Sequence, residues 1–311
     1  MSDTPGRIVA GILAADWIVG GLVQDETLVT SVQRFPPPSD SEAALTSLPA
    51  DQVVAVIGGQ IRTLCAEHGI AVEALSGIGV GFPGIIQDGV IEESPNLQQM
   101  KGCRLRDSLR ASLANDVPIT ISNDADALAA GIAATHGYLA KLIRVWTLGR
   151  GIGYGRYPAA PGVWEGGHMV VTLDPKEKFC GCGGTGHLEG IMGTRAMRKR
   201  FLDMEPDEVF ANAKAGDERC ARFAHLWHRA LAAATASSIH ISGPGRFYIT
   251  GPNSRYVDLD LLGRYVYEMV KMSPLQGSLF QIAPVNDSIA IIGAAVNALP
   301  EKQYLLTYQS N

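Results

Sequence analysis

The sequence predicts an α/β protein with two domains. Segments rich in β-branched residues alternate with segments whose apolar residues recur every three or four positions, as in folds that layer helices on sheets. The chain has 311 residues, which is more than one hydrophobic core usually serves. Its 46% hydrophobic and 18% charged residues are an ordinary globular balance and argue against long disordered regions.

The expected elements begin with a three-stranded meander, followed by a helix whose apolar face includes Val53 and Ile61. Strands are expected at 8–15, 17–24, 28–35, 75–82, 118–122, 143–149, 246–251 and 278–285, with a hairpin that turns at Asp88-Gly89. Helices are expected at 49–68, 105–114, 125–135, 194–201, 206–213, 217–240, 259–272 and 289–299. We expect residues 1–117 with 299–311 to form an N-terminal domain, and 118–298 to form a larger C-terminal domain that carries the cysteines discussed below.

Charge and apolar patterning argue against two classes of partner. Lys and Arg number 26 against 31 Asp and Glu, a net charge of −5, and no long run of one sign indicates a nucleic-acid surface. The start of the chain has no basic segment leading into an apolar stretch, and no window of about 18 apolar residues follows. We therefore expect a cytoplasmic protein without a membrane partner.

Four side chains with metal-binding chemistry lie in one glycine-rich stretch: His168, Cys180, Cys182 and His187. Neutral imidazole and thiolate are the usual ligands of tetrahedral zinc, and glycines let the backbone fold tightly around an ion. Only Gly181 separates the two cysteines, a closer spacing than in zinc fingers. The sequence favours a structural zinc site; the alternative is a pair of buried free cysteines with two surface histidines.

A second candidate is Asp124, at the point where an expected strand ends and a helix begins. Ligands of open α/β sheets collect at the carboxyl ends of strands, and a carboxylate there can accept a proton from an attacking hydroxyl. The alternative is that Asn123 or Asp124 serves only as the N-cap of the helix.

A third candidate is the glycine-rich segment after the strand at 143–149. Glycines at 149, 151, 153 and 155 allow backbone N–H groups to turn toward an anion such as phosphate; a glycine-rich β-hairpin explains them equally well. In a fourth segment, Glu165 and His168 lie beside tight glycines. This pair suits a polyol site, and a solvated loop is the alternative.

Taken in order, these segments resemble the ROK family of repressors, open reading frames and sugar kinases, over essentially the whole chain. The family's Cys-x-Cys-Gly-x-x-Gly-Cys-x-Glu run is matched from Cys180 to Glu189, with His187 in place of the third cysteine. The resemblance implies a two-domain actin-like ATPase or ribonuclease H-like fold of the sugar kinases, with the ligand cleft between the domains. It also implies a homodimer.

The segments that bind sugar in the family match position by position. Gly81–Gly84 resembles its Gly-x-Pro-Gly turn, and Ser94–Leu97 resembles its Pro-Asn-Leu segment. The resemblance places sugar hydroxyls on Asn96, Asn123, Asp124, Glu165, His168 and Glu189, with His168 also on zinc.

The segments that bind nucleotide in the family depart from its pattern. The opening Asp-x-Gly-Gly-Thr-Lys loop is missing, and Leu13 takes the place of the aspartate. Arg150 replaces a threonine and Tyr154 replaces a glycine in the second phosphate loop, and Pro252 interrupts the last glycine segment. The resemblance to the family places ATP on Gly149, Arg150, Gly151, Gly153 and Gly251.

The resemblance implies an ATP- and Mg²⁺-dependent kinase that phosphorylates a hydroxyl of a hexose, amino sugar or related cyclitol, with Asp124 as general base. A second interpretation is a sugar-binding regulatory protein with weak activity or none. Arg150 offers a cation to phosphate in place of lost contacts, and Asp16 offers a substitute metal carboxylate. We do not expect a repressor, because the first strand begins almost at residue 1 and leaves no room for a helix-turn-helix domain.

Overall fold

A computed structural model of the chain describes residues 7–15, 17–36, 44–160 and 162–299. These residues form two compact units. The units are drawn from the following parts of the chain: unit 1 from Met1–Ile143, Gly155–Val163 and Asn286–Asn311, and unit 2 from Arg144–Tyr154 and Trp164–Val285.

The predicted boundary after residue 117 differs from these units. Strand β8 (Ile119–Asn123) lies in unit 1 because it pairs in parallel with β5 (Gly77–Phe82). Helix α4 (Asp124–Thr135) also lies there, because helix α10 (Asp287–Asn297) returns from the end of the chain to pack against it. These long-range contacts, rather than continuity along the chain, define unit 1.

Unit 1 is built on a six-stranded sheet in the order β3-β2-β1-β5-β8, with β4 also paired to β2. Strand β1 (Ile8–Ala14) is antiparallel to β2 (Ile18–Gln24) and parallel to β5. The predicted strand at 28–35 is instead two short strands, β3 (Thr27–Leu28) and β4 (Gln33–Phe35), which pair with different parts of β2. The central strands are buried almost throughout, as their near-continuous apolar runs predict.

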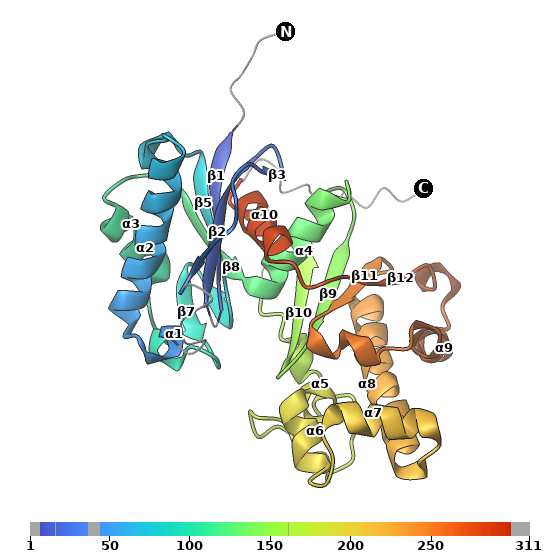
Figure 1. Ribbon diagram of the computed structural model, residues 1–311. Coiled ribbons are helices and arrows are strands. Elements are labelled where there is room, and N and C mark those ends of the chain that lie inside the picture. The colour runs from blue at the N-terminus through green and yellow to red at the C-terminus, as the bar shows by residue number, and fades with distance from the viewer. Residues whose placement is uncertain (1–6, 16, 37–43, 161, 300–311) are drawn as a thin grey trace. The chain divides into compact units, whose positions relative to one another are not determined.

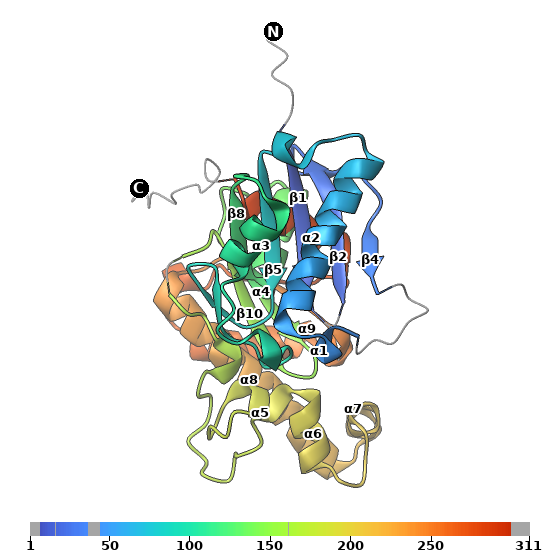
Figure 2. The ribbon, with the colours of Figure 1, turned by 90° about the vertical axis from the view of Figure 1, so that its left-hand side faces the viewer.

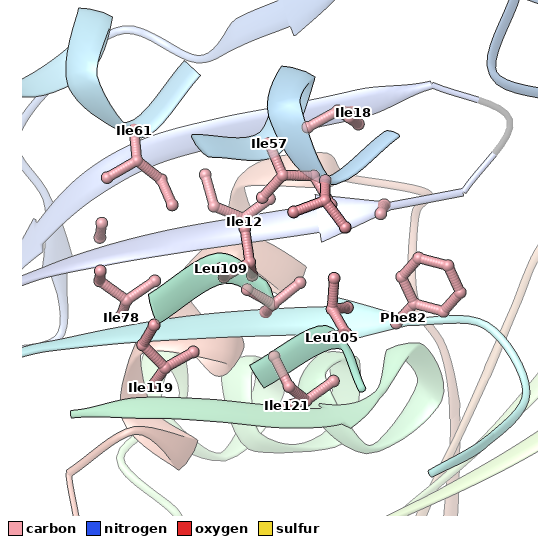
Figure 3. Close-up of a cluster of buried hydrophobic side chains, with 14 of the residues drawn as sticks. Ile12, Ile18, Ile57, Ile61, Ile78, Phe82, Leu105, Leu109, Ile119 and Ile121 are labelled. Carbon is pink, nitrogen blue, oxygen red and sulfur yellow. The ribbon is translucent and has the colours of Figure 1, made fainter. Parts of the chain in front are cut away.

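Helices cover both faces of this sheet. Helices α2 (Ala50–Glu67) and α3 (Leu105–Leu113) lie on one face, and α4 and α10 lie on the other (Figures 1 and 2). Figure 3 shows the core beneath α2 and α3, where Ile12, Ile57, Phe82 and Leu109 are fully buried. The apolar face of α2 predicted from its period is therefore the face that packs on the sheet.

Helices α4 and α10 approach each other until their backbones touch. A Cβ atom at Gly293 would lie 1.7 Å from the carbonyl oxygen of Ala127, and one at Gly131 would lie 1.8 Å from that of Ile289. Only glycine fits at both positions. This close contact fixes the start of α4, where the candidate Asp124 lies.

The remaining elements of unit 1 are short. They are α1 (Ala44–Ser47), the 3₁₀ turns η1 (Val72–Ala74) and η2 (Gln98–Met100), and the hairpin β6 (Ile85–Gln87) and β7 (Val90–Glu93). The hairpin turns at Asp88-Gly89 as predicted, and both residues have positive φ, the conformation that such tight turns require.

A four-stranded sheet in the order β10-β9-β11-β12 lies mainly in unit 2. Its strands are β9 (Ile143–Leu148), β10 (Ile152–Tyr157), β11 (Arg246–Thr250) and β12 (Leu279–Ile282). The longest helix, α8 (Glu218–Ser242), begins at Asp217, whose carboxylate accepts the Cys220 N–H at 2.8 Å. Its residues Phe223, Trp227 and Leu231 are buried in the core, as the three- and four-residue spacing predicts.

The other helical elements of unit 2 are η3 (Gly166–His168), α5 (Leu188–Met192), α6 (Thr194–Arg200), α7 (Pro206–Ala215), η4 (Pro252–Tyr256), α9 (Leu259–Met269) and η5 (Ser273–Leu275). Helices α5, α7 and α9 pack against α8. Within the described ranges, no helix is both long enough and apolar enough to cross a membrane.

Candidate functional site

Asn123 and Asp124 lie where β8 ends and α4 begins, as predicted. The Asn123 Oδ1 caps the helix by accepting the Ala125 N–H at 2.9 Å, and Asp124 Oδ1 accepts the same N–H at 2.9 Å. The Asn123 amide donates to the carbonyl oxygen of Gly84 at 2.9 Å. Asn123 therefore caps the helix. The cap fixes the position of Asp124, which remains the candidate general base.

The turn that resembles Gly-x-Pro-Gly lies beside this cap. It follows β5, whose last residue Phe82 is paired with Asn123. The buried Ser94 hydroxyl donates to the carbonyl oxygen of Pro83 at 2.8 Å, and Leu97 is fully buried, so Asn96 between them is exposed on an anchored segment. Unit 1 thus presents a constrained set of polar groups: Asn96, Asn123 and Asp124.

An apolar side chain lies next to these groups. A Cβ atom at Gly81 would lie 3.1 Å from Leu13 Cδ1 and 3.6 Å from the Asp124 Cα. Leu13 therefore stands beside Asp124 at the position where the resemblance expects a metal-binding aspartate. Asp16, the predicted substitute carboxylate, lies outside the described residues.

The β1–β2 hairpin itself is closed by local contacts. The Ala15 N–H donates to the Trp17 carbonyl oxygen at 2.8 Å, and the Arg34 guanidinium lies 4.2 Å from the centre of the Trp17 ring. A cation over an indole face is an attractive arrangement. The hairpin is thus stabilised by a backbone hydrogen bond and by side-chain packing.

The four predicted metal ligands converge in unit 2. Their ligand atoms all lie within 4.8 Å of one another. Sγ of Cys180 lies 3.3 Å from Sγ of Cys182 and 3.5 Å from Nδ1 of His168, and Cys182 Sγ lies 3.3 Å from Nδ1 of His187. Tetrahedral zinc with these ligands places the donor atoms roughly 3.3–3.8 Å apart, so the donor set fits zinc.

Burial raises the pKa of the Cys180 thiol to about 12. A metal ion binds the thiolate, so its binding must displace this proton. The 3.3 Å separation of Cys180 and Cys182 is too long for a disulfide. The arrangement is that of two thiols and two imidazoles gathered around one point.

The loop that carries the cysteines is tied to helix α6. Arg200 of α6 pairs with the buried Glu177 through both carboxylate oxygens and stacks 4.5 Å from the centre of the Phe179 ring. The Glu177 carbonyl oxygen accepts the Gly186 N–H at 2.7 Å. These contacts hold the loop at both ends of the cysteine segment.

Glu165, His168 and Glu189 lie close enough to act on one another electrostatically. Burial is the main cause of the raised pKa of Glu165; His168 partly offsets the rise, and the negative charge of Glu189 adds to it. Glu189 Oε1 lies 3.6 Å from Cys180 Sγ. The predicted sugar ligands of unit 2 therefore adjoin the metal ligands.

The glycine turn between β9 and β10 is held by two distant segments. The Gly149 carbonyl oxygen accepts hydrogen bonds from the Thr194 N–H at 3.0 Å, the Thr194 hydroxyl at 3.2 Å and the Asn253 amide at 3.1 Å. Asn253 is only 3% exposed. Gly251, just before Asn253, packs so closely that a Cβ there would lie 2.5 Å from the Leu148 carbonyl oxygen.

The amides of this turn also contact side-chain oxygens. Glu189 Oε2 accepts the Ile152 N–H at 3.1 Å, and the Thr147 hydroxyl accepts the Gly153 N–H at 3.1 Å. Tyr154, which takes the place of a family glycine, packs its ring 4.7 Å from that of Trp146, and its hydroxyl lies 2.7 Å from Ser238 Oγ. Its bulk is therefore accommodated in the core of unit 2.

A sequence model of the ROK family matches residues 18–300. The chain belongs to the ROK family. It is 27% identical to a glucokinase of Pyrobaculum calidifontis over 71% of this chain and 77% of that one, and 30% identical to an N-acetylmannosamine kinase of Escherichia coli over 50% of this chain and 56% of that one. The structure resembles a ROK hexokinase of Thermus thermophilus with a TM-score of 0.76 at 22% identity, covering 94% of this chain and 98% of that one.

The ROK fold confirms the predicted fold class, an α/β protein of the actin-like ATPase and ribonuclease H-like type. Within unit 2 the structure brings together the four predicted metal ligands, and it brings Gly149 beside the segment of Gly251. Sequence reasoning missed the roles of Thr194 and Asn253 in holding the turn. The available signal was their position beside glycines, at Gly193-Thr194 and Gly251-Pro252-Asn253.

Proposed function

We propose that this ROK protein is an ATP-dependent sugar kinase that phosphorylates a hydroxyl of a hexose, an amino sugar or a related cyclitol. Membership of the ROK family and the kinase relatives support this class. The observation that carries the proposal is the placement of Asp124 at the first turn of α4, held there by the Asn123 cap.

Asp124 is the general base of the proposed reaction. Its carboxylate accepts the proton of the sugar hydroxyl as the hydroxyl oxygen attacks the terminal phosphorus of ATP, and the bond from that phosphorus to the bridging oxygen breaks to release ADP. The proposed hydrogen-bonding groups for the other hydroxyls are the side chains of Asn96, Asn123, Glu165, His168 and Glu189. Correct orientation of the attacking hydroxyl is a large part of the rate gain in such reactions.

The turn at Gly149–Gly153 and the adjoining Gly251 are the proposed phosphate and nucleotide contacts of this chain. Their backbone N–H groups suit an anion, and Arg150 adds a cation beside them. Bound Mg-ATP supplies the phosphoryl group and, through the metal, part of the charge neutralisation. Zinc on His168, Cys180, Cys182 and His187 is proposed as a structural ion that holds His168 beside the sugar.

Replacement of Asp124 by Asn tests this role. We expect Asp124→Asn to lower kcat about 10²–10⁴-fold with little change in sugar affinity, as measured by a coupled ADP-release assay and by calorimetry with glucose and N-acetylmannosamine. The matched control is Asp126→Asn in the same helical turn, because Asp126 accepts the Arg156 N–H at 2.8 Å and Asn retains that acceptor. If kcat fell equally in both variants, or did not fall in Asp124→Asn, Asp124 would not be the general base.

One observation favours a second function, a sugar-binding regulatory protein without fast turnover. Leu13 lies where a magnesium-binding carboxylate is expected, so β1 offers no such ligand beside Asp124. Calorimetry separates the two functions. Mg-ATP binding that strengthens with sugar supports the kinase, whereas sugar binding without any heat from Mg-ATP supports the regulatory protein.

A further inference from the structure

We propose that the Glu189 carboxylate occupies the phosphate-binding turn of the sugar-free protein, so that a phosphoryl donor binds tightly only after sugar has drawn this carboxylate away. The inference rests on the proposed kinase function and adds to it an order of binding and a residue that enforces the order.

The carboxylate lies directly on the backbone of the turn. Glu189 Oε2 accepts the Ile152 N–H at 3.1 Å, and a Cβ atom at Gly151 would lie 2.5 Å from the same oxygen. Gly151 is therefore required for this approach. An N–H group of such a turn is the donor that a phosphate oxygen would use, so Glu189 and phosphate compete for it.

Charge strengthens this competition. The turn carries the exposed Arg150, whose guanidinium favours an incoming phosphate. The negative charge of Glu189 next to the same turn opposes a second anion and offsets that attraction. A carboxylate on the Ile152 N–H thus makes the turn less attractive to polyphosphate than its glycines and arginine alone would.

The other side of the Glu189 carboxylate faces the proposed sugar and metal ligands. Its Oε1 lies 3.6 Å from Cys180 Sγ, and its charge acts on the carboxyl of Glu165, one of the proposed sugar ligands. Sugar hydroxyls between Glu165 and Glu189 would separate two negative charges and give Glu189 new O–H donors. Glu189 would then exchange the Ile152 N–H for hydroxyl donors, so its carboxylate stays hydrogen-bonded while the Ile152 N–H becomes available to a phosphate oxygen.

The test measures anion binding in the absence of sugar. We would titrate the parent, Glu189→Gln and Glu189→Ala with magnesium tripolyphosphate by calorimetry, and then repeat the parent titration with saturating glucose or N-acetylmannosamine. We expect sugar to raise the parent's affinity for tripolyphosphate about tenfold. Both variants should show a similar gain without sugar, because neither places a negative charge on the turn.

Glu268→Gln is the matched control, since this exposed glutamate of α9 removes the same charge away from the turn. Its sugar-free affinity for tripolyphosphate should equal that of the parent. Unchanged affinity in both Glu189 variants would overturn the inference, and so would reduced affinity, which would make Glu189 only a support of the turn. If either result is found and the parent still phosphorylates sugar, the kinase function stands and only the proposed order of binding is wrong. If the parent neither binds tripolyphosphate nor phosphorylates sugar, the proposed kinase function is wrong as well.

Discussion

Two turns that the resemblance places beside nucleotide phosphates are built in different ways. The β9–β10 turn keeps its glycines, and the Gly149 carbonyl oxygen is fixed by Thr194 and Asn253. The β1–β2 hairpin has Leu13 beside Asp124 and is closed by the stacking of Arg34 on Trp17. One turn therefore retains backbone groups suited to an anion, and the other is stabilised by apolar and cation–π contacts.

The contrast lies in which segments keep the family pattern. The segments that the resemblance places on sugar match the ROK pattern, whereas the β1–β2 hairpin, which it places on nucleotide, departs from that pattern. If the protein transfers a phosphoryl group, the charge that develops on that group must be stabilised mainly by unit 2. Oriented amides and cations supply most of such stabilisation, and the β9–β10 turn with Arg150 lies in unit 2. Zinc removal, loosening of the β9–β10 turn and restoration of a carboxylate at residue 13 each test this division.

The largest effect is expected from removal of the proposed zinc. Cys180→Ser should lower zinc content from one equivalent and destabilise unit 2 by several kcal/mol, since metal binding is coupled to folding of its loop. Elemental analysis and thermal unfolding followed by tryptophan fluorescence measure both effects, because the buried Trp146 and Trp227 report on unit 2. Cys220→Ser, at a buried cysteine outside the cluster, is the control and should retain zinc. Unchanged zinc in Cys180→Ser would reject the metal site.

A smaller effect is expected from Asn253→Ala. The variant removes the amide that donates to the Gly149 carbonyl oxygen at 3.1 Å and to the Thr194 hydroxyl at 3.0 Å. Loss of these buried hydrogen bonds should cost about 1–3 kcal/mol of stability, and the looser turn should lower kcat/KM for the donor about 10–100-fold. Steady-state kinetics with varied ATP measures this change, with sugar KM as the internal reference.

Arg34→Met is the matched variant in the other turn. It keeps an unbranched apolar side chain but removes the cation from the Trp17 ring, so stability should fall by about 0.5–1 kcal/mol and KM for the donor should not change. If Arg34→Met and Asn253→Ala changed kcat/KM for the donor equally, both turns would contact the donor. The proposed difference between the two turns would then be wrong.

Local patterns predicted the elements well because local forces determine them. The helix expected at 49–68 is observed at Ala50–Glu67, since its apolar face has the helical period. The helix expected at 289–299 begins earlier, at Asp287, because Asn286 caps it by accepting the Ser288 N–H at 2.9 Å. The clustering of the four predicted metal ligands was also predictable, because their chemistry and glycine spacing lie in one short stretch.

The contacts that hold the β9–β10 turn were not predictable from local sequence patterns. Gly149, Thr194 and Asn253 are far apart in the sequence, and no periodicity relates them. Glu189 is evident in the sequence as an acidic residue. Its contact with the Ile152 N–H depends on where the fold places α5. The division into units likewise follows from the return of α10 to α4, which is a tertiary contact.

The most direct test of the hairpin is Leu13→Asp, because its effect should depend on divalent metal. The new carboxylate would lie beside Asp124, so without divalent metal the like charges should lower stability by about 1–3 kcal/mol. Added Mg²⁺ should recover much of this loss by binding between the two carboxylates. Thermal unfolding with and without MgCl₂ measures the change, and Leu13→Asn, which adds polarity without charge, is the control. A Mg²⁺ response shared equally by both variants would mean that the hairpin cannot hold a metal beside Asp124, and that the charge neutralisation for phosphoryl transfer has moved to unit 2.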